Sequence, residues 1–433
     1  MRGFVLLLAL AGCDSDLRIS DIKAEVSPDI PTVITVRWAT DLPSDGFVRF
    51  WADDGVVHTT AVQGEDSLEH EALLLGLPAT TEVGFEVVAL DDEGGESIAD
   101  GDPVTTGSLP PELPALTVTG TPMDAWMVTP LLGGPIGAVI LDGQGRYVWW
   151  YLFESELDTY RALLSVDGQS LLLNEADISD PSPDSVIQRV ALDGSSVERI
   201  PVPYLAHDIV ELPDGTIGAI ASFTEGKVKG DSIVEVAPDG TLTTVWTTFD
   251  CFDPATDIGD DQEYGWTWAN ALDYDPAQDC YYISLRNFST VQQVFRDGTC
   301  GWAFGSVGAT VEPSGSSETF LHSHQFEVSD GRFLVFDNDG SPAQESRVLE
   351  YDFDPGAGTA EQIWEYHADP PVFSFVLGDV HRFDDGDTLV TWSVNGMIQR
   401  VSPEGEVGLQ IVSAFGHPFG FNTVREDLYA QDD

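Results

Sequence analysis

The segment Ile233–Trp246, with the sequence IVEVAPDGTLTTVW, shows most clearly the hairpin pattern on which the fold prediction rests. Two stretches of alternating residues flank a Pro-Asp-Gly turn, which is typical of paired, half-buried strands. The pattern recurs at Val139–Trp150, Val186–Ile200, Val291–Phe304, Val348–Tyr366 and Ile398–Ile411. A second kind of hairpin alternates with it, at Tyr160–Asn174, His207–Ser222, Trp268–Arg286, His324–Asn338 and Asp379–Ser393, with a degenerate copy near Trp126–Leu132.

Two successive hairpins form a four-stranded sheet, and a chain that repeats such sheets at a period of roughly 50 residues is typical of a β-propeller. Six copies are present, so we predict an all-β fold with a six-bladed β-propeller over residues 117–433. The alternative is a large double-sheet β-structure, which the regular alternation of the two hairpin types disfavours.

Residues 13–107 contain a separate group of short alternating strands, among them Thr32–Trp38, Gly46–Trp51 and Val83–Ala89. Strands of this spacing predict a small β-sandwich. Trp38 and the later turn Leu75–Thr81 resemble those of a fibronectin type III module, although Val83 stands where that module has a tyrosine. The Pro-rich residues 108–116 predict a stiff linker to the propeller.

The N-terminus predicts export. Arg2 precedes the short apolar run Phe4–Ala11, which is typical of a secretory signal and too short to span a bilayer. The ending Leu10-Ala11-Gly12-Cys13 resembles the bacterial lipobox, which implies a signal peptide over residues 1–12 and lipidation of Cys13. We therefore expect an exported protein that contacts the membrane of the cell envelope only through this lipid; ordinary signal cleavage is the alternative.

The charge balance excludes several classes of partner. The 433 residues include 74 Asp and Glu against 18 Lys and Arg, a formal net charge of −56. Such a surface repels phosphate backbones, so nucleic-acid binding is not expected. A small anionic substrate would need a site built locally from a few basic side chains.

The hairpin geometry collects the unusual polar residues of the chain at one place. The tight turns of the second hairpin type lie at one end of each blade, so the residues that open its first strand and close its second lie at the other end. This argument gathers His207, Asp208, Trp268, Asn270, Arg286, His322, His324, Asp337, Asn338, Asp379, His381 and Arg382 at one mouth of the central channel. We expect the functional site at this mouth.

The same argument places Cys280 and Cys300 at the opposite end of one blade, each at a turn, whereas Cys251 follows an outer strand that runs toward the mouth. Export permits disulfides. The sequence therefore predicts a Cys280–Cys300 bridge and a free Cys251.

Two kinds of chemistry fit the polar residues at the mouth. His322 and His324 share one side of a strand and, with Asp208, Asp379 and His381, suggest a metal-dependent hydrolase. No further ligand spacing supports such a site, so we expect neither a metal nor another cofactor. In the second interpretation, a neutral histidine attacks sulfur or phosphorus while Arg286 and Asn270 hold the oxygens and another histidine moves the proton.

Several motifs resemble those of bacterial arylsulfate sulfotransferases, and they occur in that family's order. The motifs are Leu205–Gly215 with its His-Asp opening, Gly265–Asn270 followed by Ser284–Val291, His322-Ser323-His324 followed by Phe336-Asp337-Asn338, and Gly378–Arg382. The resemblance implies a periplasmic, six-bladed enzyme that is independent of phosphoadenosine phosphosulfate. Such an enzyme transfers a sulfuryl group from a phenolic sulfate to a phenol through a sulfated histidine.

Carried over by position, the resemblance implies that His324 is the nucleophile, that His207 assists proton transfer, and that Asn270 and Arg286 hold the sulfuryl oxygens. The substrate would contact Trp268, His322, Asp379 and His381. Three positions depart from the family pattern: Trp268 replaces a histidine, Gln325 an aspartate and Gly265 an aspartate. Because of the missing histidine, a catalytically impaired, ligand-binding propeller is the alternative.

Overall fold

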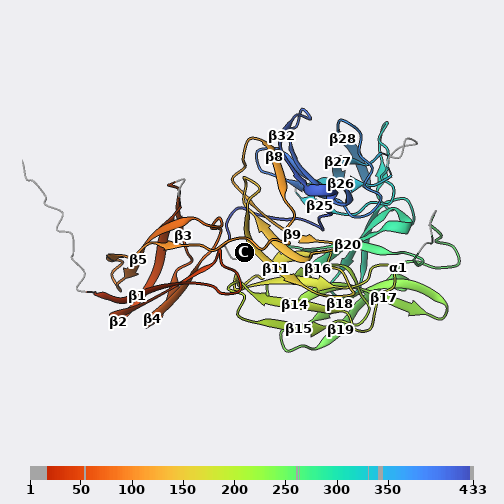
Figure 1. The fold of residues 1–433 in the computed structure, drawn as a ribbon. Coiled ribbons are helices and arrows are strands. Elements are labelled where there is room, and N and C mark those ends of the chain that lie inside the picture. The colour runs from red at the N-terminus through yellow and green to blue at the C-terminus, as the bar shows by residue number, and fades with distance from the viewer. Residues whose placement is uncertain are drawn as a thin grey trace, which may run out of the picture. The chain divides into compact units, whose positions relative to one another are not determined.

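A computed structural model describes residues 17–52, 55–259, 262, 264–329, 331–339 and 345–429, apart from the side chains of residues 65 and 66. The expected signal peptide over residues 1–12 and the lipidation site Cys13 lie outside the described residues. The chain forms two compact units, residues 1–109 and residues 110–433, whose strands are labelled in Figure 1. No helix in the described ranges combines the length and the apolar character needed to cross a membrane.

The N-terminal unit is organised by one long strand, β2 (Ile34–Trp51). The first half of β2 pairs with β1 (Ile19–Val26) and β4 (Gln63–Leu74), and the second half pairs with β5 (Glu82–Leu90) and β3 (Val57–Thr59). The strands β6 (Glu96–Asp100) and β7 (Val104–Thr105) both pair with β5. The result is a curled antiparallel sheet of seven strands. Assignment of this unit to the fibronectin type III class stays a prediction.

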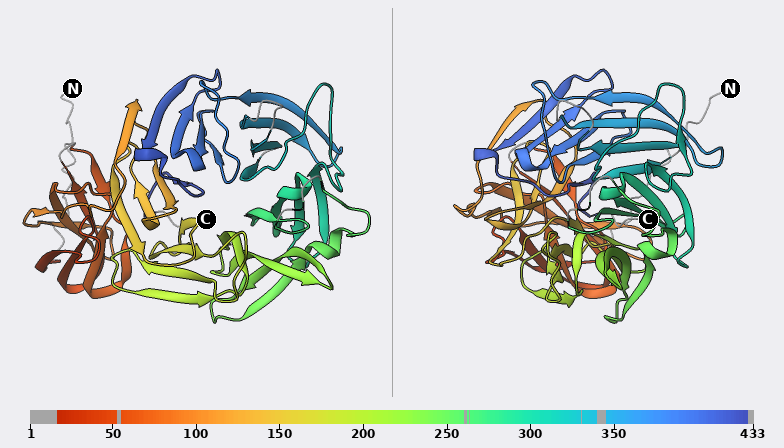
Figure 2. Two further views of the ribbon diagram at one scale, coloured as in Figure 1. Left: turned by 45° about the vertical axis from the view of Figure 1, so that its right-hand side comes forward. Right: turned by 90° about the vertical axis from the view of Figure 1, so that its right-hand side faces the viewer.

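The second unit confirms the predicted six-bladed propeller, and Figure 2 shows its blades arranged in a ring. From the innermost strand outward, blade one contains β33 (Thr423–Arg425), β9 (Trp126–Leu131), β10 (Ile136–Leu141) and β11 (Tyr147–Phe153). Blade two contains β12 (Ala162–Leu164), β13 (Ser170–Glu175), β14 (Val186–Ala191) and β15 (Val197–Pro201). Blade three contains β16 (Leu205–Glu211), β17 (Ile217–Glu225), β18 (Val228–Val236) and β19 (Leu242–Thr247).

The remaining blades follow the same order. Blade four contains β20 (Ala269–Asp275), β21 (Cys280–Leu285), β22 (Thr290–Phe295) and β23 (Cys300–Gly305). Blade five contains β25 (Phe326–Ser329), β26 (Arg332–Asp337), β27 (Arg347–Asp354) and β28 (Thr359–Tyr366), with β24 (Glu312–Pro313) parallel to β28. Blade six contains β29 (Asp379–Arg382), β30 (Thr388–Trp392), β31 (Met397–Val401) and β32 (Val407–Ser413).

Two pairings between strands from distant parts of the chain close the ring of blades. Strand β33 pairs with β9 as the inner strand of blade one, and β8 (Leu116–Gly120) pairs with β32 as an additional outer strand of blade six. The degenerate hairpin expected near Trp126–Leu132 is therefore completed by the C-terminal segment. Both closures protect strand edges that would otherwise remain open.

Aromatic side chains fill the space between neighbouring blades. Phe304 of β23 packs edge-on against Phe333 of β26 and Tyr351 of β27, and all three are fully buried. Burial of one such side chain stabilises the fold by about 1.5–3 kcal/mol. This packing fixes the blades relative to one another, which is what brings residues from different blades to defined positions around the channel.

The predicted Cys280–Cys300 disulfide is wrong. The bridge joins Cys251 to Cys300, whose Cα atoms are 6.0 Å apart, and Cys280 is buried and unbridged. Strand β22 lies between β21, which Cys280 opens, and β23, which Cys300 opens. Two strand spacings of about 4.8 Å exceed the reach of a disulfide.

The observed bridge links two blades. Cys251 ends the short helix α1 (Thr248–Cys251), which follows the outer strand β19 of blade three. This strand passes beside the turn before Cys300, because a Cβ atom at Gly298 would lie 2.9 Å from the Val245 carbonyl oxygen. Because the bridge joins residues of two blades, the strand pattern of either blade alone does not predict it.

Candidate functional site

The six innermost strands start at the same level, so equivalent residues form two successive rings around the channel. Each innermost strand pairs with the next strand of its own blade, and six residues occupy corresponding positions in these pairings: Ala162, Ile209, Leu272, Phe326, Val380 and Thr423. Two positions earlier, the first ring consists of Tyr160, His207, Asn270, His324, Gly378 and Phe421. The second ring, one position earlier, consists of Arg161, Asp208, Ala271, Gln325, Asp379 and Asn422.

The first ring brings two of the predicted catalytic histidines together. The imidazole rings of His207 and His324 meet edge-on with their centroids 6.1 Å apart. The ring of Tyr160 lies 6.1 Å from that of His207, and the ring of Phe421 lies 6.3 Å from that of His324. Both imidazoles are 0% exposed. The pair is therefore enclosed by aromatic side chains from neighbouring blades.

The tautomer of His324 is fixed by Asn338, which closes β26. The Nδ2 atom of Asn338 donates to the carbonyl oxygens of Ser374 and Leu377, at 2.6 and 2.7 Å. Its Oδ1 atom must then be the acceptor that lies 2.8 Å from His324 Nδ1. His324 Nδ1 consequently carries the proton, and Nε2, which has no hydrogen-bond partner among the described residues, carries the lone pair.

Burial keeps both histidines neutral. Burial and, to a smaller extent, the charge of Arg286 lower the pKa of His207 to about 3. Burial also lowers the pKa of His324 well below its ordinary value, with additional contributions from His207 and Arg286. Neither ring nitrogen of His207 makes a hydrogen bond of standard geometry with a described residue. At neutral pH both imidazoles are therefore uncharged.

Arg286 and Trp268 form a cation–aromatic pair next to these histidines. The guanidinium carbon of Arg286 lies 4.7 Å from the centroid of the Trp268 ring, and the indole also meets His207 edge-on at 5.6 Å. Trp268 Nε1 donates to the Ile178 carbonyl at 3.1 Å, and Tyr264 packs on the indole at 4.5 Å. Trp268 has a φ of +44°, a backbone conformation that is unfavourable for a bulky residue.

Asn270 contacts the segment that carries His324. Its Nδ2 atom donates to the Ser323 carbonyl at 2.7 Å, and its Oδ1 atom is buried without a partner among the described residues. One amide hydrogen is thus committed to holding blade four against blade five. The resemblance implied that Asn270 holds the sulfuryl oxygens. Only its second Nδ2 hydrogen remains as a donor for such a contact.

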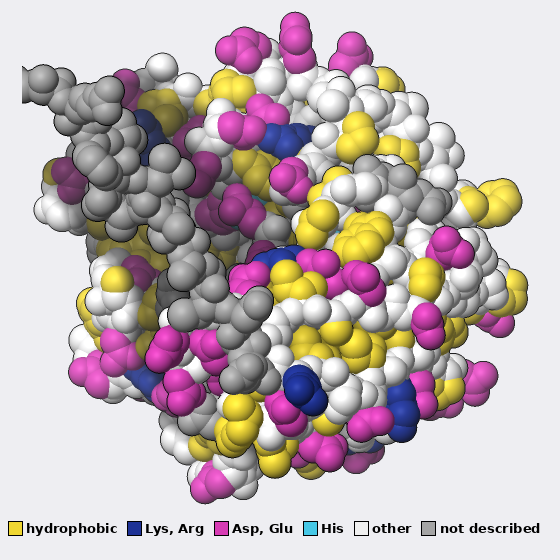
Figure 3. All heavy atoms as spheres, turned by 90° about the vertical axis from the view of Figure 1, so that its left-hand side faces the viewer, with side chains coloured by type: hydrophobic (Ala, Val, Ile, Leu, Met, Phe, Trp, Pro, Cys, Tyr) yellow, Lys and Arg dark blue, Asp and Glu magenta, His cyan; other side chains and the backbone are white. Residues whose placement is uncertain are grey.

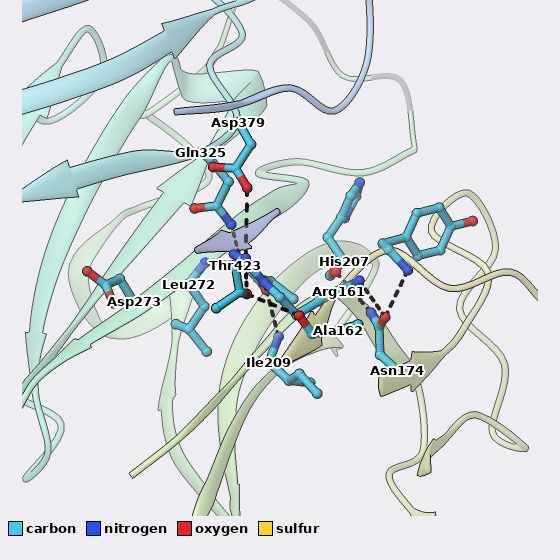
Figure 4. Close-up of polar contacts among 12 residues, drawn as sticks. Arg161, Ala162, Asn174, His207, Ile209, Leu272, Asp273, Gln325, Asp379 and Thr423 are labelled. Atoms are coloured by element: carbon cyan, nitrogen blue, oxygen red, sulfur yellow. Dashed lines mark hydrogen bonds and ion pairs between the residues drawn. The ribbon is translucent and has the colours of Figure 1, made fainter. Parts of the chain in front are cut away.

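The second ring contains a buried ionic layer, shown in Figure 4. Arg161 donates to both carboxylate oxygens of Asp208, from Nε at 2.6 Å and from Nη2 at 3.1 Å. Asp208 also accepts the backbone N–H groups of Ile209 and Leu272, both at 2.9 Å. Gln325 Nε2 donates to the same carboxylate at 2.6 Å. Asp208 therefore joins blades two, three, four and five.

Asp379 completes this layer from blade six. Its Oδ2 atom lies 3.9 Å from Arg161 Nη1 and accepts the backbone N–H of Asn422 at 2.6 Å. Burial raises the pKa of Asp379 to about 7, although Arg161 acts in the opposite direction. Asp379, predicted to contact substrate, thus lies in the layer that carries Arg161, and no hydrogen bond joins it directly to either catalytic histidine candidate among the described contacts.

Among the described contacts, the side chains of His322 and His381 do not touch the rings of His207 and His324. His322 Nδ1 lies 3.5 Å from Asp339 Oδ2, and its backbone N–H donates to Ser289 Oγ. His381 Nδ1 lies 2.7 Å from Glu327 Oε1. Burial opposes protonation of His381, but Glu327 outweighs this effect and raises its pKa. His381 lies on the expected strand, β29, whereas the expectation that His322 and His324 share one side of a strand is wrong: His322 lies in a bend before β25 and has a φ of +52°. Each imidazole is paired with a carboxylate of its own.

The sequence analysis missed Arg161, and it named Asn338 and Gln325 without their roles as the partner of His324 and as a donor to Asp208. Arg161 follows Tyr160 at the same repeat position at which Asp208 follows His207. Alignment of the blade openings was the signal that could have found it. Gln325 gives a physical reason for one departure from the family pattern, because an amide can donate to Asp208 whereas an ionised aspartate cannot.

The described side chains form no group of three or more His, Cys, Asp or Glu residues that could hold a metal ion. The chain is a six-bladed β-propeller with a buried imidazole pair, a guanidinium and a tryptophan at one end of its channel. It belongs to the arylsulfotransferase (ASST) family, whose sequence model matches residues 135–413. Aryl sulfates and phenols are the substrates that this family implies.

Comparison with solved structures gives only distant similarity. A protein of unknown function from Bacteroides caccae is 14% identical, with a TM-score of 0.47, and the match covers 71% of this chain and all of that one (100%). TolB from Acinetobacter baumannii is 11% identical over 81% of each chain, with a TM-score of 0.43. A periplasmic gluconolactonase from Pseudomonas aeruginosa is 15% identical, with coverage of 80% and 95% and a TM-score of 0.42. Comparison with curated proteins finds no matching sequence.

Proposed function

We propose that this protein transfers a sulfuryl group from a phenolic sulfate ester to a phenol, through a sulfohistidine at His324. The observation that carries the proposal is the hydrogen bond from His324 Nδ1 to Asn338 Oδ1, at 2.8 Å, in a buried site. It leaves the Nε2 lone pair of a neutral imidazole available for attack, which is the activation that a histidine nucleophile needs. Membership of the arylsulfotransferase family supports the substrate class.

In the first step, His324 Nε2 forms a bond to sulfur while the bond from sulfur to the phenolic oxygen breaks. The electron pair of that bond leaves on the phenolate, whose conjugate acid has a pKa near 10, so little protonation is needed. The attacking imidazole becomes positively charged. The hydrogen bond from Nδ1 to Asn338 then becomes charge-assisted and strengthens as the charge develops.

Arg286 supplies the positive charge that an anionic substrate needs on this acidic protein. Its charge already lowers the pKa of His207, so the negative charge of a bound sulfate offsets that effect and favours the protonated form of His207. His207 then hydrogen-bonds the leaving phenolate. Trp268, which packs on Arg286, offers its indole face to the aromatic ring of the donor.

In the second step, the acceptor phenol replaces the first phenolate. Its oxygen attacks the sulfur, its proton passes to His207, and the bond from sulfur to His324 Nε2 breaks, which restores the neutral imidazole. His207 then releases the proton to solvent, where it neutralises the first phenolate. The reaction needs positioning and charge stabilisation rather than a cofactor, as in phosphoryl transfer. A buried, aromatic-lined site also disfavours water as the acceptor.

The proposed location is outside the cytoplasm, with a lipid on Cys13 as the membrane anchor. The Cys251–Cys300 bridge supports export, because structural disulfides persist in oxidising compartments. Metabolic labelling with a fatty-acid analogue tests the anchor: wild-type protein should carry the label, and a Cys13→Ser variant should not. Label on that variant would contradict the assignment.

One observation favours a second candidate, a propeller that binds aryl ligands without transferring sulfuryl groups. Trp268 occupies the position of the family's histidine, packs against His207 and is bonded to Ile178, while both catalytic candidates are fully buried. Transfer requires the indole to move when the donor binds. A binding protein would take up aryl sulfate in a calorimetric titration and release no phenol.

The test is an assay with para-nitrophenyl sulfate, with and without an acceptor phenol. Rapid release of nitrophenol only in the presence of acceptor, and its loss in His324→Ala, support sulfuryl transfer. His367→Ala is the control, since His367 lies between Glu345 and Glu365 away from the imidazole pair. Equal activity of His324→Ala and wild-type protein would refute the proposed nucleophile.

A further inference from the structure

The residues that directly follow the two catalytic histidine candidates are hydrogen-bonded to each other. Asp208 follows His207, and Gln325 follows His324. Gln325 Nε2 lies 2.6 Å from Asp208 Oδ2, and these side chains are 4% and 0% exposed. This is the closest link between the two segments, because the imidazoles themselves share a ring contact and no hydrogen bond among the described interactions.

Asp208 is an unusually well-fixed acceptor for this bond. Its carboxylate receives two hydrogen bonds from Arg161 and two from backbone N–H groups in blades three and four. Arg161 is itself held by a contact of its guanidinium with the Phe421 ring, at 5.0 Å from the centroid. A displacement of Asp208 would therefore break contacts in several blades.

The link determines how the imidazoles lie. Adjacent residues share a planar peptide unit, so a fixed Asp208 side chain restrains the backbone that carries His207, and a fixed Gln325 side chain restrains the backbone that carries His324. The link acts together with the contact of the two rings, 6.1 Å apart, and with the Asn338 hydrogen bond that orients His324. Displacement of a reacting group by about 1 Å costs on the order of 100-fold in rate.

We propose that the Gln325–Asp208 hydrogen bond, anchored by Arg161, is a positioning element that sets the separation of His207 and His324 for the two steps of sulfuryl transfer. The proposal rests on the proposed function for its kinetic consequences, whereas the geometric claim stands by itself. Gln325 is a positioning residue, since its effect on the reaction passes through His324. The amide is required here because a carboxylate at the same place would face Asp208.

The informative variant is Gln325→Glu, which keeps the shape of the side chain and replaces the donating nitrogen by oxygen. At about pH 8 two carboxylates would face each other, and kcat should fall on the order of 100-fold while KM stays within about threefold. Burial and the charge of Asp208 raise the pKa of the introduced acid. As the pH falls, the neutral acid can donate its proton to Asp208, so the ratio of variant to wild-type kcat should recover.

Gln188→Glu is the matched control. Gln188 is also 0% exposed and donates from Nε2 to a buried carboxylate, Glu175 Oε2, at 2.7 Å, but it lies on β14, outside the two rings. The two variants should lose similar thermal stability. Only Gln325→Glu should lose kcat per folded molecule and show the recovery at low pH.

A kcat of Gln325→Glu that matches that of Gln188→Glu at every pH would overturn the proposal, because the link would then be structural only. If the wild-type protein itself lacks transfer activity, the proposed function fails and crystal structures of wild type and Gln325→Glu decide the geometric claim. A larger separation of His207 and His324 in the variant supports the positioning role, and an unchanged separation overturns it.

Discussion

Replacement of Asn338 by alanine should separate the chemical role of His324 from the stability of its surroundings. Asn338 accepts a hydrogen bond from His324 Nδ1 and donates to two carbonyl oxygens, so the alanine variant removes the group that selects the tautomer of His324. His324 can then place its proton on Nε2, where the lone pair is needed for attack. The expected result is a lower kcat with little change in KM for the donor.

The magnitude follows from the change in charge during the reaction. In the ground state His324 Nδ1–H donates to Asn338 as a neutral group, and such a hydrogen bond is worth about 0.5–1.5 kcal/mol; after attack on sulfur the ring is cationic and the bond is worth about 1.5–3 kcal/mol. Only the difference of about 1–1.5 kcal/mol acts on kcat, and about 1.4 kcal/mol corresponds to a factor of ten, so loss of the acceptor should lower kcat roughly 5-fold to 13-fold.

Ser346→Ala is the matched control for this experiment. Ser346 Oγ donates to the Asn338 carbonyl at 2.8 Å and accepts the Ser374 N–H at 2.9 Å, so it belongs to the same cluster without contacting His324. The assay measures initial rates of nitrophenol release, normalised to folded protein by thermal unfolding. The reasoning is refuted if Asn338→Ala keeps wild-type kcat, or if Ser346→Ala loses as much.

Three further predictions follow from the site and the fold. Arg286→Met should lower kcat on the order of 100-fold to 1,000-fold, because it removes a donor to the charged sulfuryl oxygens. Arg286→Lys keeps the charge and should lose less. Equal kcat values for the two variants would argue against direct contact of Arg286 with the sulfuryl group. The double variant Cys251→Ser, Cys300→Ser should lose about 4 kcal/mol of unfolding free energy in a denaturant titration, because it removes a cross-link that spans 49 residues. Cys280→Ser should not show this loss. An unchanged unfolding midpoint for the double variant would contradict the pairing. Burial raises the pKa of Asp379 to about 7, far above its unfolded value, so the folded protein binds more protons between about pH 4 and pH 7 and this group's contribution to stability falls across that range. The thermal midpoint should therefore drop less between about pH 5 and pH 7 in Asp379→Asn than in wild type, and equal drops would contradict the assignment.

The sequence predicted the propeller because its signals are local and repeated. Alternating strands and Asp-Gly turns, as in Ile233–Trp246, specify each blade, and the end of a strand specifies the face on which a residue lies. That is why His207, His324, Asn270 and Arg286 could be placed at one mouth without knowledge of their contacts. The composition also predicted an acidic surface. On the face drawn in Figure 3, carboxylate side chains (magenta) are widespread and Lys and Arg side chains (blue) are few.

What the sequence could not predict depends on contacts between blades. The partner of Cys300 was missed because it lies on the outer strand of the preceding blade, and Arg161 because its importance comes from Asp208 in the next blade. His381 lies on the expected strand, but its imidazole is hydrogen-bonded to Glu327 of blade five. Side-chain pairing across a blade interface is set by the twist and packing of whole sheets, which no local pattern encodes.

The decisive measurement is the mass of the intact protein after incubation with an aryl sulfate donor and no acceptor, followed by peptide mapping at neutral pH. The account predicts one sulfuryl adduct per chain, on the imidazole of His324, which disappears when a phenol is added and does not form in His324→Ala. An unmodified wild-type chain that nevertheless transfers sulfuryl groups, or an adduct on another residue, would contradict it.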